Sequence, residues 1–485
     1  MTSTFSSVIS TDICIIGGGS GGLSIAAGAV QMGAEVALIE KAEMGGDCLN
    51  TGCIPSKALL AAAKAAYTAN GQPAMGVSVS SPPQIDFAAA KDHVDEVIAG
   101  IAPHDSISRF EGLGVQVLTG AARFAGPAAV IAETETGPVK ITARYFVIAT
   151  GSEPWIPPIA GLSDTPFYTN ETIFSLRDAA EHLVIIGGGP IGIEMAQAHI
   201  RLGCRVSVIE PFALLARDDP ELSRTLITML EAEGITFHRD AHIKTVTQAG
   251  STIHVMLETG QTLEASHLLV AAGRRANIAG LALEKARITA SVRGITTDER
   301  LRTSNRRVFA IGDVAGRHQF THIAGYHASI VIRNMLFMLP AKLDNRAVPW
   351  VTYTDPELAH TGMSKADAEA QYGAPALKIT DWPFSENDRA RAERKTSGMV
   401  RVITDKRGRI LGASILAPHA GEMIHSWTLA INAGLNISAM ANAIAPYPSW
   451  SEASKRAAGA WFTETLFAER TKKLVRFLLM FQKRG

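Results

Sequence analysis

Two cysteines separated by four residues, Cys48 and Cys53 in "GGDCLNTGCIPSK" (residues 45–57), offer the most readily predicted chemistry in this 485-residue chain. On a regular helix, residues five apart have Cα atoms roughly 8 to 9 Å apart, whereas a relaxed disulfide needs about 4.4 to 6.8 Å. A bond between these sulfurs therefore requires a distorted first turn, and a strained, accessible disulfide is easily reduced. The spacing alone leaves three interpretations open: a structural cross-link, half of a metal site, or a redox pair.

The surrounding composition narrows these interpretations. Two thiolates without a second pair or a nearby His do not complete a tetrahedral ligand set, so we expect no permanent metal ion. Four cysteines in so long a chain argue against a secreted disulfide scaffold. The other two, Cys14 and Cys204, lie in apolar stretches and are predicted to be small buried residues.

Charge and length exclude several classes of protein. Lys plus Arg and Asp plus Glu balance at 46 each, so no net field favours nucleic acid as a partner. The N-terminus lacks a basic signal segment, and no run of about 18 apolar residues is long enough to span a membrane. We expect a cytoplasmic enzyme of several domains.

An internal repeat provides the elements that must position the cysteines. Residues 12–41 and 182–211 share the order apolar strand, glycine turn, helix, apolar strand, acid, with 23 residues from first glycine to acid in both copies. In such turns the glycines allow close backbone approach to a pyrophosphate at a helix N-terminus, and the acid accepts ribose hydroxyls. Two dinucleotides in two doubly wound α/β domains are therefore predicted. The residues are Gly17, Gly19, Gly22 and Glu40 in the first copy and Gly187, Gly189, Gly192 and Glu210 in the second.

Three further strands end in polar turns. "ITARYFVIATGSEP" ends in residues 150–152, "SHLLVAAGRRANI" turns at Gly273, and "RRVFAIGDVAG" places Asp313 after an apolar strand. The carboxylate of Asp313 either holds a sugar-like part of a cofactor or caps the following helix. From about residue 346 the pattern changes to alternating strands and then helices, which predicts a third, α+β domain.

The order of these segments resembles the flavin-dependent pyridine nucleotide-disulfide oxidoreductases, the family of dihydrolipoamide dehydrogenase, glutathione reductase and mercuric reductase, over about residues 10–465. The resemblance implies an α/β fold with two Rossmann-like domains, one for FAD and one for NAD(P), a C-terminal α+β dimerisation domain, and a homodimer. The expected boundaries are 1–153 and 276–345 for the split FAD domain, 154–275 for the NAD(P) domain, 346–465 for dimerisation, and 466–485 for a basic amphipathic tail.

The resemblance also implies residue roles. Cys53 would lie beside the flavin, and Cys48 would be the interchange thiol. Lys57 would pair with Glu194 near the flavin and lower the pKa of Cys53. The alternative for Lys57 is a solvated surface charge. Electrons would pass from the nicotinamide through FAD to the cysteine pair and then to an outside acceptor. The implied FAD contacts are Gly17, Gly19, Gly22, Glu40, Lys41, Gly46, Asp47, Lys57, Gly120, Ala121, Thr150, Gly151, Ser152, Asp313, Thr321 and His322, and the implied NAD(P) contacts are Gly187, Gly189, Gly192, Glu210 and Gly273.

The acid of the second repeat bears on the choice of nicotinamide. Glu210 suits the free 2′-hydroxyl of NAD, whereas NADP calls for an arginine such as Arg217, seven residues on. We therefore expect NADH rather than NADPH.

One position departs from the family's disulfide reductases, which carry a His-Pro pair near the C-terminus and a glutamate four residues after the proline. In "AIAPYPSWSE" Pro448 and Glu452 match, but Tyr447 replaces the His that serves as acid-base group for the interchange thiol. A Tyr is a poor general base at neutral pH, so turnover of dihydrolipoamide or glutathione should be impaired unless Tyr447 only packs in the dimer interface. Mercuric reductases also have Tyr there, but they use in addition a C-terminal cysteine pair, and residues 481–485, "FQKRG", contain no cysteine.

We therefore expect an enzyme that oxidises NAD(P)H and passes electrons through Cys48 and Cys53 to a small-molecule or protein disulfide or a thiol-reactive metal ion. A true dihydrolipoamide dehydrogenase and an electron-transfer flavoprotein serving a protein or membrane quinone are the alternatives. The last twenty residues predict a basic amphipathic helix that either contacts an anionic membrane peripherally or docks on the protein itself. Its charged residues are Glu469, Arg470, Lys472, Lys473, Arg476, Lys483 and Arg484.

Overall fold

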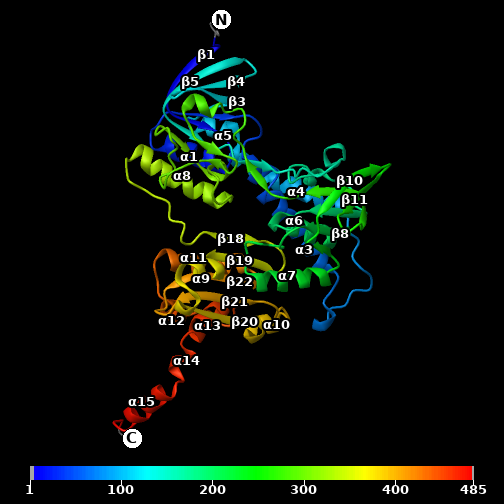
Figure 1. The fold of residues 1–485 in the computed structure, drawn as a ribbon, viewed down its shortest axis with the longest axis vertical. Helices are drawn as coiled ribbons and strands as arrows, with labels where there is room; N and C mark the ends of the chain where they lie inside the picture. Colours follow the sequence, from blue (N-terminus) through cyan, green and yellow to red (C-terminus); the bar gives the residue numbers. More distant parts are fainter. Residues whose placement is uncertain (1–4, 483–485) are drawn as a thin grey trace. The chain divides into compact units, whose positions relative to one another are not determined.

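The structure, a computed structural model, describes residues 5–482 and divides into two compact units (Figure 1). Unit 1 comprises residues 5–213 and 234–343, and unit 2 comprises residues 214–233 and 344–482. Both helices and strands are abundant in each unit, which agrees with the predicted α/β fold class. The finer boundaries between the FAD, NAD(P) and dimerisation domains stay a prediction.

The first βαβ repeat lies at the centre of a six-stranded sheet in unit 1. Strand β1 (Ser7–Ile16) pairs in parallel with both β2 (Val36–Glu40) and β5 (Gly137–Ile148). Its residues 13–16 are almost fully buried because side chains cover both faces of the sheet, as a continuous apolar run predicts. Helix α1 (Ser20–Gln31) packs against α8 (Thr321–Leu336) over one face. The other strands are β3 (Gln116–Gly126), β4 (Ala129–Thr134) and β17 (Val308–Ala310).

The second repeat forms a four-stranded parallel sheet in the order β13-β7-β8-β9. Helix α6 (Pro190–Arg201) connects β7 (His182–Ile186) to β8 (Arg205–Glu210), so both predicted βαβ units are present. The parallel sheet is completed by β9 (Thr236–Arg239) and β13 (His267–Val270), and an antiparallel sheet is formed by β10 (Ile243–Ala249), β11 (Thr252–Leu257) and β12 (Thr262–Ala265).

Helices and short strands connect the two repeats within unit 1. Helix α3 (Cys53–Ala69) packs against both α4 (Phe87–Ile101) and α6. Strands β6 (Ser152–Pro154) and β14 (Arg274–Ala276) pair in antiparallel fashion. Unit 1 also contains α2 (Gly46–Asn50), α5 (Ile107–Gly112), β15 (Ala290–Ser291), β16 (Gly294–Ile295) and the 3₁₀ helix η6 (Gly312–Ala315).

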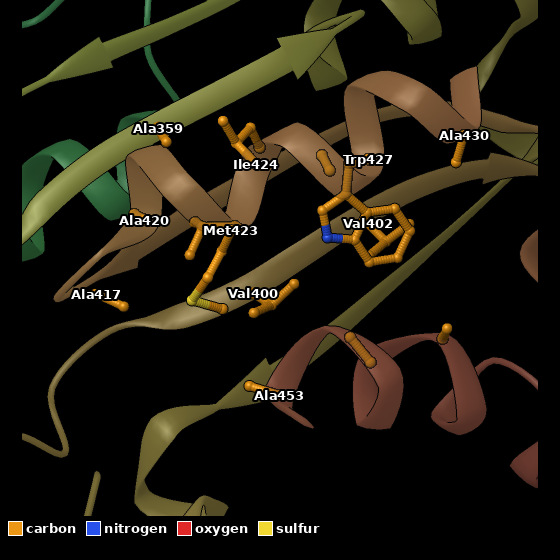
Figure 2. Packing of buried hydrophobic residues seen from close by; sticks show 14 of the residues in the cluster. Ala359, Val400, Val402, Ala417, Ala420, Met423, Ile424, Trp427, Ala430 and Ala453 are labelled. Carbon is orange, nitrogen blue, oxygen red and sulfur yellow. The ribbon is translucent and has the colours of Figure 1, made fainter. Parts of the chain in front are cut away.

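Unit 2 contains the predicted third α+β domain, a five-stranded antiparallel sheet in the order β18-β19-β22-β21-β20. The strands are β18 (Pro349–Thr352), β19 (Glu357–Gly362), β20 (Leu377–Pro383), β21 (Met399–Asp405) and β22 (Ile410–Ala417). Trp427 of α11 (Ala420–Asn432) is fully buried among Val400, Val402 and neighbouring apolar residues (Figure 2), and its indole N–H donates to Ser454 Oγ at 3.1 Å. The other helices are α7 (Pro220–Ala232), α9 (Lys365–Tyr372), α10 (Asp388–Ala392), α12 (Ile437–Asn442), α13 (Glu452–Ala460), α14 (Thr463–Leu466) and α15 (Glu469–Leu479).

Buried polar contacts hold α7 within unit 2. Arg401 of β21 contacts Asp219 at 3.0 Å, Glu221 at 2.7 Å and Asp381 at 2.6 Å. Asp218 accepts a hydrogen bond from the indole N–H of Trp350 at 2.9 Å, and its burial raises its pKa to about 6. Among the described residues, no helix combines the length and apolar character needed to cross a bilayer.

Candidate active site

The chain between the two cysteines is not a continuous helix. Helix α2, which carries Cys48, ends at Asn50, and α3 begins at Cys53 after two non-helical residues, Thr51 (φ −141°) and Gly52 (φ −128°, ψ −111°). The turn is therefore distorted, as a bond between the two sulfurs would require, and both cysteines are free thiols in this structure. A Cβ at Gly52 would lie 2.8 Å from the carbonyl oxygen of Asp47, which explains why glycine occupies this position.

Asp47 connects this break to a distant segment. One carboxylate oxygen accepts from Thr51 Oγ1 at 2.9 Å and from Asn170 Nδ2 at 3.0 Å. The same amide nitrogen of Asn170 lies 3.3 Å from the Thr51 carbonyl oxygen. Because Asn170 is buried, its amide fixes the residues on both sides of Cys48.

The two thiols differ in acidity. The pKa of Cys53 is lowered to about 6, first by a hydrogen bond from the Cys48 thiol and further by Thr321 and the positive charge of Lys57, against the opposing effect of burial. The sulfur of Cys53 lies 3.3 Å from Thr321 Oγ1 at the start of α8. The hydrogen bond to Cys53 and burial raise the pKa of Cys48. Cys53 is therefore the thiolate of the reduced pair at neutral pH.

Lys57, one turn after Cys53, forms an ion pair with Glu194 of α6. The two charged groups are 2.7 Å apart, with the Glu194 side chain 6% exposed and the Lys57 side chain 37% exposed. The predicted ion pair is thus present, and Lys57 is not an isolated surface charge. Its role beside a flavin stays a prediction.

Both glycine turns are closely packed. A Cβ at Gly17 would lie 2.4 Å from the Ala149 carbonyl oxygen, and one at Gly22 would lie 1.9 Å from the carbonyl oxygen of Gly17. The second copy repeats this packing: the corresponding distances are 2.3 Å at Gly187 and 2.0 Å at Gly192. Helices α1 and α6 begin at these turns without a side-chain cap, so their first N–H groups face the turn.

The acids at the ends of β2 and β8 also match. Glu40 accepts from the Gly18 backbone N–H at 2.5 Å, and Glu210 accepts from the Gly188 N–H at 2.6 Å. The second oxygen of Glu210 accepts from the N–H of Phe212 at 2.9 Å. Each carboxylate thus stabilises the glycine turn of its own repeat, which the sequence did not predict. Each carboxylate oxygen also has a further lone pair that can accept a hydrogen bond from a ribose hydroxyl.

Asp313 belongs to a polar cluster around Arg274. Its carboxylate accepts from Ser152 Oγ at 2.5 Å, and Arg274 donates to the same Ser152 oxygen at 2.7 Å. Arg274 also lies 3.4 Å from Asp47, and burial raises the pKa of Asp313. The capping alternative for Asp313 is wrong, because Ile311 occupies the N-cap of η6.

The remaining implied FAD residues are spread around this site. Gly46 lies against the first glycine turn, since a Cβ there would be 2.8 Å from Gly19 Cα, and Thr150 Oγ1 donates to the Asn277 carbonyl at 2.7 Å. Lys41 is exposed after β2, and His322 stacks on Phe320. Gly120 and Ala121 lie where β3 pairs with β4, and Gly151 has a φ of +68°. Gly273, an implied NAD(P) contact, has a φ of +132°. The cofactor contacts of these residues stay predictions.

Tyr447 lies on a loop of unit 2 and is 69% exposed. Its hydroxyl donates to the Asp388 carboxylate at 3.0 Å, and this hydrogen bond raises the pKa of the phenol. Glu452, which would orient a His at position 447 in the family's disulfide reductases, instead accepts from Arg456 at 2.9 Å. The orienting partner of Tyr447 in this chain is therefore Asp388, a residue that the sequence analysis missed.

Comparison with known proteins decides the family. A model of the pyridine nucleotide-disulphide oxidoreductases matches residues 11–328, and a model of their dimerisation domain matches residues 348–458. The chain belongs to this family. The mercuric reductase of Streptomyces lividans is 36% identical over 456 residues, which cover 92% of this chain and 95% of that protein. The dihydrolipoyl dehydrogenase of Chlamydia muridarum is 33% identical over 453 residues, covering 91% and 94%.

Solved structures agree. The Cu(II) complex of RclA from Escherichia coli, a HOCl-induced flavoprotein disulfide reductase, superposes with a TM-score of 0.84 and 28% identity, covering 93% of this chain and 99% of that chain. The predicted class is confirmed: this pyridine nucleotide-disulphide oxidoreductase is an FAD- and NAD(P)H-dependent oxidoreductase. Its dimerisation domain supports the homodimer typical of the family.

The residues present fit both dinucleotides of a pyridine nucleotide-disulphide oxidoreductase. Each glycine turn has no room for a side chain at its first and third glycines, which leaves the backbone open to a pyrophosphate, and each is held by the carboxylate at the end of the following strand. Among the described residues, no group of three or more His, Cys, Asp or Glu is arranged to hold a metal ion.

Besides Asp388, two polar residues around Cys48, Asn170 and Arg274, were missed as site residues. Arg274 directly follows Gly273 in the "GRRAN" segment, and this charge inside an otherwise apolar strand end was a usable signal. Asn170 lies in "FYTNETIF", where nothing in the sequence distinguishes it from an ordinary turn residue.

Proposed function

We propose that this enzyme uses NADH to reduce a soft, thiol-binding metal ion, with Hg²⁺ and Cu²⁺ as the first acceptors to test, through the Cys48–Cys53 pair. The observation that carries the proposal is the contrast between the low pKa of the Cys53 thiol and the raised pKa of Tyr447, which is hydrogen-bonded to Asp388. The thiolate is ready to donate electrons, while the position of the acid-base residue holds a group that does not titrate near pH 7.

This contrast discriminates between acceptors. A disulfide acceptor produces two thiolates that must be protonated, so its rapid reduction needs a group with a pKa near 7 close to the interchange thiol. A soft metal ion binds thiolates and needs no proton when it is reduced. Tyr447 in place of His therefore penalises disulfides more than metal ions.

The proposed steps balance. NADH transfers two electrons and one proton to the Cys48–Cys53 disulfide, which becomes the Cys48 thiol and the Cys53 thiolate, and FAD, when bound, relays the electron pair. The pair loses one proton when it binds Hg²⁺, the sulfur–sulfur bond re-forms, and the metal receives two electrons as Hg⁰. With Cu²⁺ the same pair reduces two ions to Cu⁺. The ion pair with Glu194 fixes the positive charge of Lys57 next to Cys53, and this positive charge favours the thiolate form of Cys53.

The relatives support this acceptor class. Several mercuric reductases are among the similar proteins, including one that is 36% identical over 92% of this chain, and the RclA structure contains Cu(II). A dihydrolipoamide dehydrogenase is the second candidate, favoured by the chlamydial relative.

An acceptor panel tests the proposal. NADH oxidation is measured with Hg²⁺, Cu²⁺, lipoamide and glutathione disulfide for the wild type, Tyr447→His and Cys48→Ser. We expect metal-dependent turnover in the wild type, its loss in Cys48→Ser, and a gain of disulfide reduction in Tyr447→His. Faster turnover of lipoamide than of either metal ion by the wild type would refute the proposal and identify a dihydrolipoamide dehydrogenase. Little turnover with any small acceptor would favour the electron-transfer flavoprotein instead.

The preference for NADH rests on Glu210. Its carboxylate lies at the end of β8 and is fixed by two backbone N–H groups, so a 2′-phosphate there would meet a negative charge. The ratio of kcat/KM for NADH and NADPH measures the preference, and a clear advantage of NADPH contradicts it.

A further inference from the structure

Helix α15 (Glu469–Leu479) exposes an unusual number of large apolar side chains. None of its residues is buried. The large apolar residues of α15 and of the residues just before and after it are each between 48% and 73% exposed: Leu466, Phe467, Leu474, Val475, Phe477, Leu478, Leu479, Met480 and Phe481. Exposed apolar surface of this extent marks an interaction site.

Most apolar and most basic residues of α15 lie on opposite faces, but Arg470 lies between Phe477 and Leu474 on the apolar side. With 100° between successive residues, Leu474 and Leu478 lie near the middle of one face. Lys472, Lys473 and Arg476 lie on the other. The predicted Lys483 and Arg484 lie outside the described residues. A helix with this distribution of charge and apolar surface is typical of segments that lie flat in a lipid headgroup region.

The position of the helix within unit 2 leaves this face open. Helix α14 is attached to the sheet by the ion pair of Glu464 with Lys378 at 2.7 Å, and α15 follows it beyond the sheet of unit 2 (Figure 1). The Thr471 hydroxyl donates to the Thr465 carbonyl at 2.7 Å and fixes the turn between the two helices. Both helices lie outside residues 348–458, which match the family's dimerisation domain.

We propose that α15 docks on an anionic lipid bilayer, with its apolar face in the headgroup–acyl boundary and its basic face toward the anionic lipids. The positive charge of the helix favours an anionic bilayer as its partner. The helix carries Arg470, Lys472, Lys473 and Arg476 against one acid, Glu469, which is itself paired with Lys472 at 2.8 Å. A second copy of the helix has no acidic surface to complement these charges, whereas an anionic bilayer does.

Cosedimentation of the full chain with unilamellar vesicles tests the proposal. Vesicles of roughly three parts phosphatidylglycerol to seven parts phosphatidylcholine are compared with pure phosphatidylcholine. We expect binding to the anionic vesicles and, because salt screens exposed charges, about tenfold weaker binding when the salt is raised to about 0.5 M. Leu478→Glu should weaken binding by at least about tenfold, and the double charge reversal Lys472→Glu, Lys473→Glu should remove the preference for anionic lipid.

Matched controls separate this contact from other effects. Val292→Glu and Lys285→Glu place an apolar-to-acid change and a basic-to-acid change at exposed residues of unit 1 and should not alter vesicle binding. NADH-dependent turnover of a water-soluble acceptor should be equal in all variants. Failure of the wild type to bind the anionic vesicles, or equal binding by Leu478→Glu, overturns the proposal. If Leu478→Glu instead converts a dimer to a monomer in sedimentation velocity, the face belongs to a second copy and the proposal is also overturned.

Discussion

The acidity of Cys53 should depend on the hydrogen bond from Cys48, because that bond is the largest influence lowering its pKa to about 6. Cys48→Ala removes the donor, while Cys48→Ser keeps a hydroxyl that can donate in the same place. The two variants therefore differ in the hydrogen bond and share the loss of the second thiol.

The expected change is large at neutral pH. With a pKa of about 6, Cys53 is about 90% thiolate at pH 7, whereas a cysteine of ordinary pKa near 8.5 is only about 3% thiolate. Thr321 and Lys57 still favour the thiolate in Cys48→Ala, so we expect the pKa to rise by at least about one unit, which corresponds to about 1.4 kcal/mol. Cys48→Ser should stay close to the wild-type value.

Ultraviolet absorbance of the thiolate, followed against pH under anaerobic conditions after reduction, measures this pKa. The buried cysteines do not interfere, because burial raises the pKa of Cys14 to about 12 and also raises the pKa of Cys204. Cys53→Ser should abolish the absorbance step near pH 6 and so assigns it.

A pKa that stays near 6 in Cys48→Ala would refute the reasoning, because the low value would then come from Lys57 and Thr321. Equal increases in the alanine and serine variants would also contradict it, since the serine retains a donor.

Three further changes test the fold and the site. Asp218→Asn keeps the acceptor oxygen but removes a buried charge. The pKa of Asp218 is about 6 in the folded state and 3.8 in the reference, so the wild type loses up to about 3 kcal/mol of its free energy of unfolding as the pH rises through this range. The variant should therefore have the higher Tm at pH 7.5 but not near pH 4. Arg401→Leu should cost about 3 to 5 kcal/mol in urea unfolding because it leaves the buried carboxylate of Asp219 unpaired. Arg123→Leu, at an exposed ion pair, should cost about 1 kcal/mol or less. Gly52→Ala should slow NADH-dependent turnover by about tenfold or more, and Gly100→Ala, with open space around its Cβ, should not.

The sequence was sufficient for features that depend on local periodicity and turn chemistry. The two βαβ repeats and the buried Cys14 and Cys204 follow from apolar runs and glycine spacing, and the structure contains all of them. Long-range contacts were not accessible in this way. Tyr447 pairs with Asp388, 59 residues away, and no local pattern relates the two positions.

Asp47 shows why a motif does not define its own geometry. Its carboxylate receives hydrogen bonds from Thr51, four residues away, and from Asn170, 123 residues away, and Arg274 adds a positive charge from a third segment. The "GDCLNTGC" segment supplies a sequence able to break its helix, but the buried amide of Asn170, held between the Asp47 carboxylate and the Thr51 carbonyl, keeps the break in one conformation. Because the hydrogen bond between the two thiols depends on that conformation, the acidity of Cys53 is a property of the folded unit 1 and not of the cysteine motif alone.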